Sequence, residues 1–181
     1  MELHMQSHRY THRWPDWPAA ALAGVVSGVV FVVFLVLDLL AAMLMGASAW
    51  KPLTMIAAIM LGPDVLTQAA TFEMGVLVAA VVVHFALAVV FGLILATIIA
   101  PFHFDSSVGM ASLVGAVFGL VLYWVNFYGM TAAFPWFAEA RSWVTAIAHI
   151  VFGLVAADSY VKLERPMEAP TGDDADSAGA R

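Results

Sequence analysis

The chain contains no cysteine and very little charge. None of its 181 residues is Cys, and only 11% are Asp, Glu, Lys or Arg. The missing thiols exclude disulfides, thiol catalysis, iron–sulfur clusters and covalently attached haem, which all require cysteine. The net charge of -6 argues against nucleic acid as a partner, because binding a phosphate backbone depends on basic residues. Soluble domains contain about 25% charged residues, so the scarcity of charge indicates a membrane protein.

Apolar sequence takes the place of the missing charge. Hydrophobic residues make up 63% of the chain, and the mean hydropathy is +0.93. A membrane span needs about 20 apolar residues, and its backbone must be hydrogen-bonded internally, which favours helices. The sequence therefore predicts an all-α polytopic membrane protein, a four-transmembrane-helix bundle. The expected spans are at about 18–45, 74–100, 108–126 and 142–161.

The first connection between spans contains one more apolar segment. Pro52 opens it and Gly62-Pro63 closes it, which is the usual placement of these residues at the two ends of a helix. At about 52–61 the segment is too short to span, so it predicts a short interfacial helix in the first periplasmic loop. Asp64 predicts a further short turn after it.

The two ends of the chain differ from the core in composition. A cytoplasmic N-terminal arm is expected at 1–17, a membrane domain at 18–161 and a disordered acidic tail at 162–181. Two arginines precede the first span and two basic residues follow the last, whereas the intervening loops contain only Lys51 and Arg141. Because cytoplasmic flanks are richer in Lys and Arg, we expect a multi-pass protein of a bacterial inner membrane with both termini cytoplasmic.

Small residues recur at helical spacing on every predicted span. Such residues let membrane helices approach closely, so they predict the faces through which the spans pack. The sets are Ala20, Gly24 and Gly28; Ala80, Ala88 and Gly92; Ala111, Gly115 and Gly119; and Thr145, Gly153 and Ala157. A Val-Phe-Gly-Leu phrase is centred on Gly92, Gly119 and Gly153. It reflects either an ancient duplication or a shared need for a small residue at helix contacts, and the second explanation is favoured.

The few polar residues inside the spans lie near these small-residue faces. Apart from Asp158 near the end of the last span, the strongest of them are Asp38, His84, Asn126 and His149, and Glu73 lies three turns before His84. A rise of 1.5 Å per residue places Asp38, His84 and His149 about 10–18 Å below the outer surface. The sequence therefore predicts one intramembrane polar cluster, open towards the periplasm. Ionisable groups inside a membrane are costly and raise a functional hypothesis.

The leading hypothesis is a non-catalytic accessory or structural component of a larger membrane assembly. In that case the polar side chains form hydrogen bonds between helices and fix their register. The expected partners are the lipid bilayer and either other membrane subunits or further copies of the chain. No motif for nucleophilic, phosphate-binding or metalloprotease chemistry is found, so the chain is not expected to be an enzyme.

Three alternatives remain open. One histidine from each of two helices can hold a b-type haem, so His84 and His149 are candidate axial ligands of an electron-transfer protein. The acidic and histidine side chains could instead carry protons or bind a cation from the periplasmic side. Copper is the third alternative, because thioethers bind Cu(I) and several methionines fall on the predicted outer side. The N-terminal arm adds His4, His8 and His12 on one helix face.

Several short stretches also resemble a known group of proteins. They are Trp14-Pro15-Asp16-Trp17-Pro18, Met55-Ile56-Ala57-Ala58-Ile59-Met60-Leu61-Gly62, His84-Phe85, Asn126-Phe127-Tyr128-Gly129, Phe134-Pro135-Trp136-Phe137 and Ala148-His149-Ile150-Val151-Phe152-Gly153. Over residues 14–160 the chain resembles small uncharacterised proteobacterial inner-membrane proteins, some described as sodium:proline symporters, and it is distantly similar to the YagU-like family. The resemblance implies an inner-membrane location and a four-span core, but no activity or site residues. Four spans are too few for a sodium symporter core.

Overall fold

The structure is a computed structural model that describes residues 14–46, 48, 50–67 and 73–164. Within these ranges every regular element is helical and none is a strand. Four helices are long and apolar enough to cross a membrane, which confirms an all-α chain and indicates a multi-pass membrane protein. They are α1 (Trp17–Leu44), α3 (Met74–Ile99), α4 (Val108–Trp124) and α5 (Trp143–Leu163). The apolar helical course of α4 continues through shorter elements as far as Ala132.

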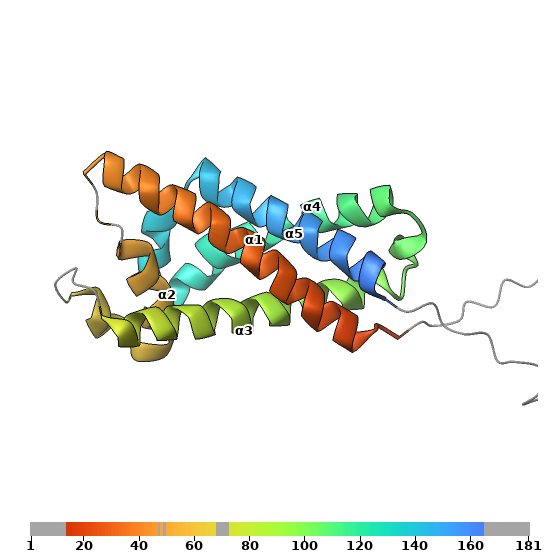
Figure 1. The fold of residues 1–181 in the computed structure, drawn as a ribbon, viewed down its shortest axis with the longest axis horizontal. Helices are drawn as coiled ribbons and strands as arrows, with labels where there is room; N and C mark the ends of the chain where they lie inside the picture. The colour runs from red at the N-terminus through yellow and green to blue at the C-terminus, as the bar shows by residue number, and fades with distance from the viewer. Residues whose placement is uncertain (1–13, 47, 49, 68–72, 165–181) are drawn as a thin grey trace, which may run out of the picture.

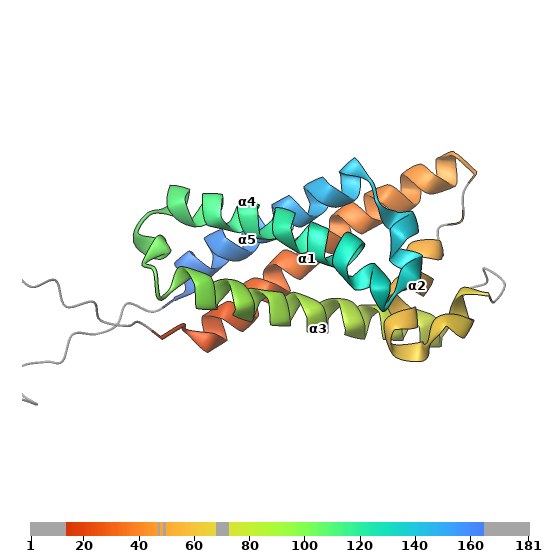
Figure 2. The same ribbon diagram turned by 180° about the vertical axis from the view of Figure 1, so that it is seen from behind.

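The four long helices form an open arrangement. Helix α1 crosses α3 diagonally and also packs on α5, while α4 runs antiparallel beside α5 (Figure 1). Helices α3 and α4 make little direct contact, and the reverse view shows them on the same side of the molecule (Figure 2). The packing order is therefore α3–α1–α5–α4, with a seam between its two outer members.

Small side chains pack together in the part of the bundle where the first and last described residues lie. At this end the backbone N–H of Asp16 donates to the Tyr160 hydroxyl over 3.2 Å, which joins the start of α1 to the end of α5. The cluster of buried residues at this end is mainly alanine; its members are Ala19, Ala20, Ala23, Leu95, Ala96, Ile99, Ala111, Ala156, Ala157 and Tyr160. Larger aromatic residues line the opposite half of the molecule, where the candidate site lies.

The glycines lie where helices approach most closely. A methyl group added to Gly24 would lie 2.5 Å from the carbonyl oxygen of Ala88, so α1 and α3 meet backbone to backbone. A methyl on Gly119 would overlap the carbonyl of His149 and one on Gly153 would overlap the carbonyl of Gly115, so α4 and α5 meet in the same way. These contacts confirm the packing faces predicted around Gly24, Gly119 and Gly153, and they favour a shared packing need as the reason for the Val-Phe-Gly-Leu phrase. Ala80 packs instead in a cluster with α2 (Lys51–Leu61).

The apolar segment in the first connection forms helix α2 (Lys51–Leu61), as expected from Pro52 and Gly62. Gly62 adopts a φ of 89°, and a short 3-10 turn, η1 (Pro63–Leu66), follows it. Ala57 and Ala58 pack in one cluster with residues of the first turns of α3. Helix α2 therefore lies beside α3 rather than apart from the bundle. Its placement at a membrane interface stays a prediction.

The expected N-terminal arm and acidic tail fall largely outside the described residues. Residues 1–13 and 165–181 are not described, and these ranges include the N-terminal histidines. Helix α5 ends at Leu163, slightly beyond the expected end of the last span at 161.

Candidate functional site

A pocket of about 360 Å³ lies in the half of the molecule away from the described ends. All four candidate spans contribute to it, together with α2 and the segment that joins α4 to α5. It is lined by Phe31, Ile56, Ile59, His84, Leu87, Ala88, Phe91, Leu122, Val125, Asn126, Phe127, Met130, Phe134, Phe137, His149 and Phe152. No Asp, Glu, Lys or Arg is among them, so the pocket is apolar except at His84, Asn126 and His149.

Helical spacing explains why these residues share one pocket. On α3 the lining residues are His84, Leu87, Ala88 and Phe91, which is the i, i+3, i+4, i+7 pattern of one helix face. On α5 Phe152 follows His149 by three positions, so both side chains lie on the same face. Helices α3 and α5 therefore each contribute one histidine to the pocket together with apolar residues of the same face.

A π-helical turn carries Asn126. This turn, η3 (Val125–Gly129), continues α4, and the backbone N–H of Met130 donates to the carbonyl of Val125 five residues earlier. Such wide turns inside α-helices are frequent at functional sites. Arg141 supports the turn, because its Nε donates to the carbonyl oxygen of Phe127 over 2.6 Å. The π turn accordingly brings the adjacent residues Asn126 and Phe127 into the pocket wall.

His149 is held by two hydrogen bonds. Its Nδ1 lies 2.8 Å from the carbonyl oxygen of Thr145, which can only accept, so Nδ1 carries the hydrogen. Its Nε2 is then an acceptor and receives the amide N–H of Asn126 over 3.4 Å. This hydrogen bond joins α5 to η3 between two residues that both line the pocket.

His84 is oriented by the backbone of α1. Its Nε2 lies 3.0 Å from the carbonyl oxygen of Gly28 and therefore donates to it. The imidazole also contacts the edge of Phe85 and the ring of Phe31. In this neutral form Nδ1 is an acceptor.

The structure brings together three of the five residues of the predicted polar cluster. His84, Asn126 and His149 line the pocket, whereas Asp38 and Glu73 are exposed and do not line it. Helix α1 is most deeply buried in its first half, in which Ala20 and Ser27 are fully buried, and most of its side chains from Val36 onward are exposed. Glu73 precedes the first residue of α3 and lies beyond the helix end. A single site that combines all five groups is therefore not formed.

The arrangement does not fit a haem held by two histidines. The ring of Phe31 contacts both imidazoles, with centroid distances of 5.6 Å to His84 and 5.0 Å to His149. The porphyrin of such a haem would need the space between the imidazoles. In addition, Nε2 of each histidine already has a protein partner.

The described part of the chain also lacks a cluster of metal ligands. No group of three or more His, Cys, Asp or Glu residues that could hold a metal ion occurs within it. The N-terminal histidines proposed as copper ligands lie outside the described residues.

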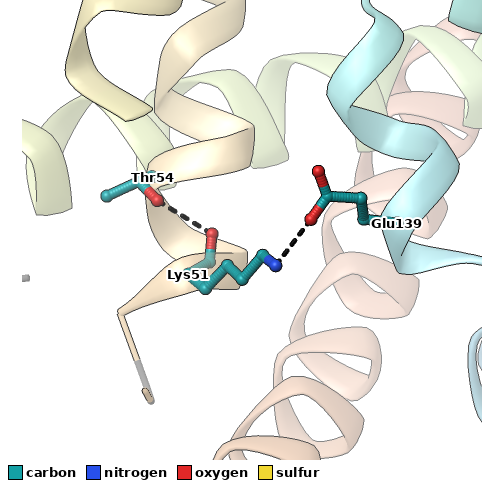
Figure 3. Close-up of polar contacts among 3 residues, drawn as sticks. All are labelled: Lys51, Thr54 and Glu139. Carbon is teal, nitrogen blue, oxygen red and sulfur yellow. Dashed lines mark hydrogen bonds and ion pairs between the residues drawn. The ribbon is translucent and has the colours of Figure 1, made fainter. Parts of the chain in front are cut away.

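Two polar contacts join α2 to η5 (Pro135–Ala140), a 3-10 segment before α5. Lys51 Nζ lies 2.6 Å from a carboxylate oxygen of Glu139, and the Thr54 hydroxyl donates to the Lys51 carbonyl (Figure 3). Nearby, the indole N–H of Trp136 donates to the carbonyl of Met55 over 3.0 Å. Because α2 and η5 both contribute pocket residues, these contacts connect two walls of the pocket.

Most of the pocket wall was not predicted from the sequence. The phenylalanines and the two isoleucines of α2 were missed, because apolar side chains are ordinary in a membrane segment. The signal that could have identified two of them is helical spacing, because Phe91 lies seven residues after His84 and Phe152 lies three residues after His149.

No family model, curated protein or solved structure matches this chain. The resemblance to small inner-membrane proteins therefore stays a prediction.

Proposed function

We propose that the chain is a small, non-catalytic integral membrane protein whose pocket binds a neutral lipophilic molecule drawn from the bilayer. The supporting observation is that His84, Asn126 and His149 converge on one apolar cavity of about 360 Å³ without a charged lining residue. Ligand pockets are typically about 300–1,000 Å³, mostly apolar, with a few polar groups that orient the ligand. The exposed side chains of Leu87, Val125 and Met130 belong to the lining, so the rim of the pocket is apolar as well.

A pair of tryptophan substitutions on α2 tests this proposal. Ile59 lines the pocket, whereas its neighbour Met60 is exposed and does not. Ile59→Trp should fill the cavity and Met60→Trp should leave it open. We expect mass spectrometry of organic extracts to find a neutral lipophile in near-stoichiometric amount with the native protein and Met60→Trp, and strongly depleted with Ile59→Trp. Equal recovery from all three proteins would contradict the proposal.

Membership of a larger membrane assembly is the second part of the proposal. Asp38 is exposed on the second half of α1, between exposed apolar residues such as Leu37 and Leu40. An isolated acidic group that faces lipid is unfavourable by about 2.5–3.5 kcal/mol at the centre of a span and by less towards its ends, and a neighbouring helix would relieve that cost. Partner subunits or further copies of the chain should therefore co-purify in mild detergent. Native mass spectrometry that finds only monomers would count against this part.

The proposed location is a bacterial inner membrane with both termini cytoplasmic. The described ends lie together, whereas α2, which begins at Lys51, and the segment before α5, which includes Arg141, lie at the other end of the molecule (Figure 1). Both basic residues are engaged there, Lys51 with Glu139 and Arg141 with the Phe127 carbonyl. The Lys/Arg bias of the two ends supports the orientation.

The alternatives gain no support from the described geometry. The separation of Asp38 and Glu73 from the histidines disfavours a proton or cation relay. A haem protein would show a Soret band when it is expressed with haem supplied. We expect no such band, and a band abolished by both His84→Ala and His149→Ala would overturn that expectation.

A further inference from the structure

The polar side chains of the pocket have unused hydrogen-bonding capacity. His84 donates through Nε2 to the Gly28 carbonyl, which leaves Nδ1 as an acceptor. A primary amide has two hydrogens and one carbonyl oxygen. Asn126 uses one hydrogen on His149 and retains one donor together with Oδ1. Within the described residues, the buried side-chain atoms without a hydrogen-bond partner do not include His84 Nδ1 or Asn126 Oδ1. Because neither atom has a hydrogen bond in the structure, each must have some accessible surface.

The unused hydrogen-bonding groups of His84 and Asn126 include more acceptors than donors. Two positions accept a hydrogen bond, His84 Nδ1 and Asn126 Oδ1, and one N–H of Asn126 donates. A hydroxyl group both donates and accepts, so it complements such a set better than a carbonyl or an ether, which only accept. The absence of charged lining residues disfavours a phosphate, carboxylate or ammonium group, because an unpaired ion in an apolar cavity is costly.

The walls of the pocket favour a flat ring. Phenylalanine side chains approach the cavity from α1, α3, α5 and the segment between α4 and α5; they are Phe31, Phe91, Phe127, Phe134, Phe137 and Phe152. Aromatic rings pair favourably in offset or edge-to-face geometry, with a gain beyond the area that they bury. The lining already shows such pairs, for example Phe31 against Phe152 with an interplanar angle of 81°.

We infer that the pocket takes a lipophilic molecule whose polar end is a hydroxylated aromatic ring, with the ring between the phenylalanines and the hydroxyl on His84 and Asn126. This inference rests on the proposed function, which requires only that some neutral lipophile binds. The apolar tail would leave through the rim at Leu87, Val125 and Met130, which lies on the side of the seam between α3 and α4.

Three synthetic probes test the inference on the full chain in lipid nanodiscs. They are 4-decylphenol, its methyl ether 4-decylanisole, and 1-tetradecanol, which has a hydroxyl but no ring. Titration calorimetry, corrected with empty nanodiscs, gives the Kd of each. One neutral hydrogen bond contributes about 0.5–1.5 kcal/mol. We therefore expect the phenol to bind about tenfold more tightly than the anisole. We expect it also to bind more tightly than the alcohol.

Substitutions assign the preference to named side chains. At least one of Asn126→Leu and His84→Phe should reduce the preference for phenol over anisole to less than about threefold, because the one hydrogen that distinguishes the two probes donates to Asn126 Oδ1 or to His84 Nδ1. Ser112→Ala is the matched control, since Ser112 lies on α4 but donates to Asp158 away from the pocket. Its preference should equal that of the native protein. Asn126→Leu retains the His84 contact with α1, so it remains informative if His84→Phe does not fold.

The outcomes separate the inference from the proposed function. Equal affinity for phenol and anisole, or for phenol and tetradecanol, would overturn the ligand class while a lipophile site remained. A phenol preference that is unchanged in both Asn126→Leu and His84→Phe would also overturn it. Failure of all three probes to bind, with the same extracted lipophile from native and Ile59→Trp protein, would overturn the proposed function and the inference together.

Discussion

At the scale of single residues, the sequence identified the polar groups of the site better than their surroundings. His84, Asn126 and His149 stand out because polar side chains are rare in the spans. Asp38 stands out for the same reason, but its position on a helical wheel cannot show that α1 is mostly exposed from Val36 onward. The hydrogen bond from His84 to Gly28 depends on how α1 crosses α3, which no local pattern reveals.

The first prediction concerns a glycine at a backbone contact. Gly119→Ala should lower the free energy of unfolding by about 1–3 kcal/mol, the usual cost of overpacking, because its methyl would overlap the His149 carbonyl. Gly109 lies on the same helix with nothing within 4 Å of an added methyl, so Gly109→Ala should be neutral or slightly stabilising. Unfolding in mixed micelles, followed by far-UV circular dichroism, measures both. Equal destabilisation by the two substitutions would contradict the close contact of α4 and α5.

At the scale of elements, long apolar runs and their flanking residues predicted the helices well. Pro52 and Gly62 predicted the two ends of α2, because these residue types mark helix ends. A turn does follow α2, but Asp64 lies inside it and Gly62 occupies the N-cap position that Asp64 was expected to take. The π turn after α4 was not predicted. It depends on one extra residue per turn and on Arg141, fourteen positions away from Phe127. The packing of α2 on α3 was also beyond the sequence, since alanines do not indicate which helix they will meet.

The second prediction concerns the contacts between α2 and η5. Trp136→Phe removes the indole hydrogen bond to Met55 and should increase amide hydrogen exchange over residues 51–61. Lys51→Met should change it little, because the Lys51 and Glu139 side chains are 59% and 60% exposed and such ion pairs contribute about 0–1 kcal/mol. Hydrogen exchange with mass spectrometry in nanodiscs compares the two variants. A larger effect of Lys51→Met would show that the ion pair, not the indole, holds α2.

At the scale of the whole molecule, the composition predicted four candidate spans. An even number of spans also predicts that the two ends of the described chain lie on the same side, as they do. The open packing order could not be predicted. Small residues show that a helix packs closely, but they do not show which of its neighbours it chooses. Only the structure shows that α3 and α4 remain largely out of contact with each other.

The third prediction tests the proposed orientation. The chain has no cysteine, so a single introduced thiol is labelled without background. Glu73 is exposed at the start of α3, and Leu163 is exposed at the end of α5. In intact spheroplasts a membrane-impermeant maleimide should label Glu73→Cys, whereas Leu163→Cys should react only after lysis. The reverse pattern would place both termini outside the cytoplasm.

The unequal lengths of the helices have a consequence for the choice of bilayer. Helix α1 has 28 residues and α5 has 21, which correspond to lengths of about 42 Å and about 32 Å. A hydrocarbon core of about 30 Å matches α5 when it stands nearly upright, but it matches α1 only when that helix is strongly inclined. Figure 1 shows α1 and α5 side by side at a similar slope, so the additional length of α1 extends beyond α5 at the end near α2. Lipids with longer acyl chains would therefore cover more of the second half of α1, where Asp38 is exposed, which makes membrane thickness a variable that acts on this half of the helix first.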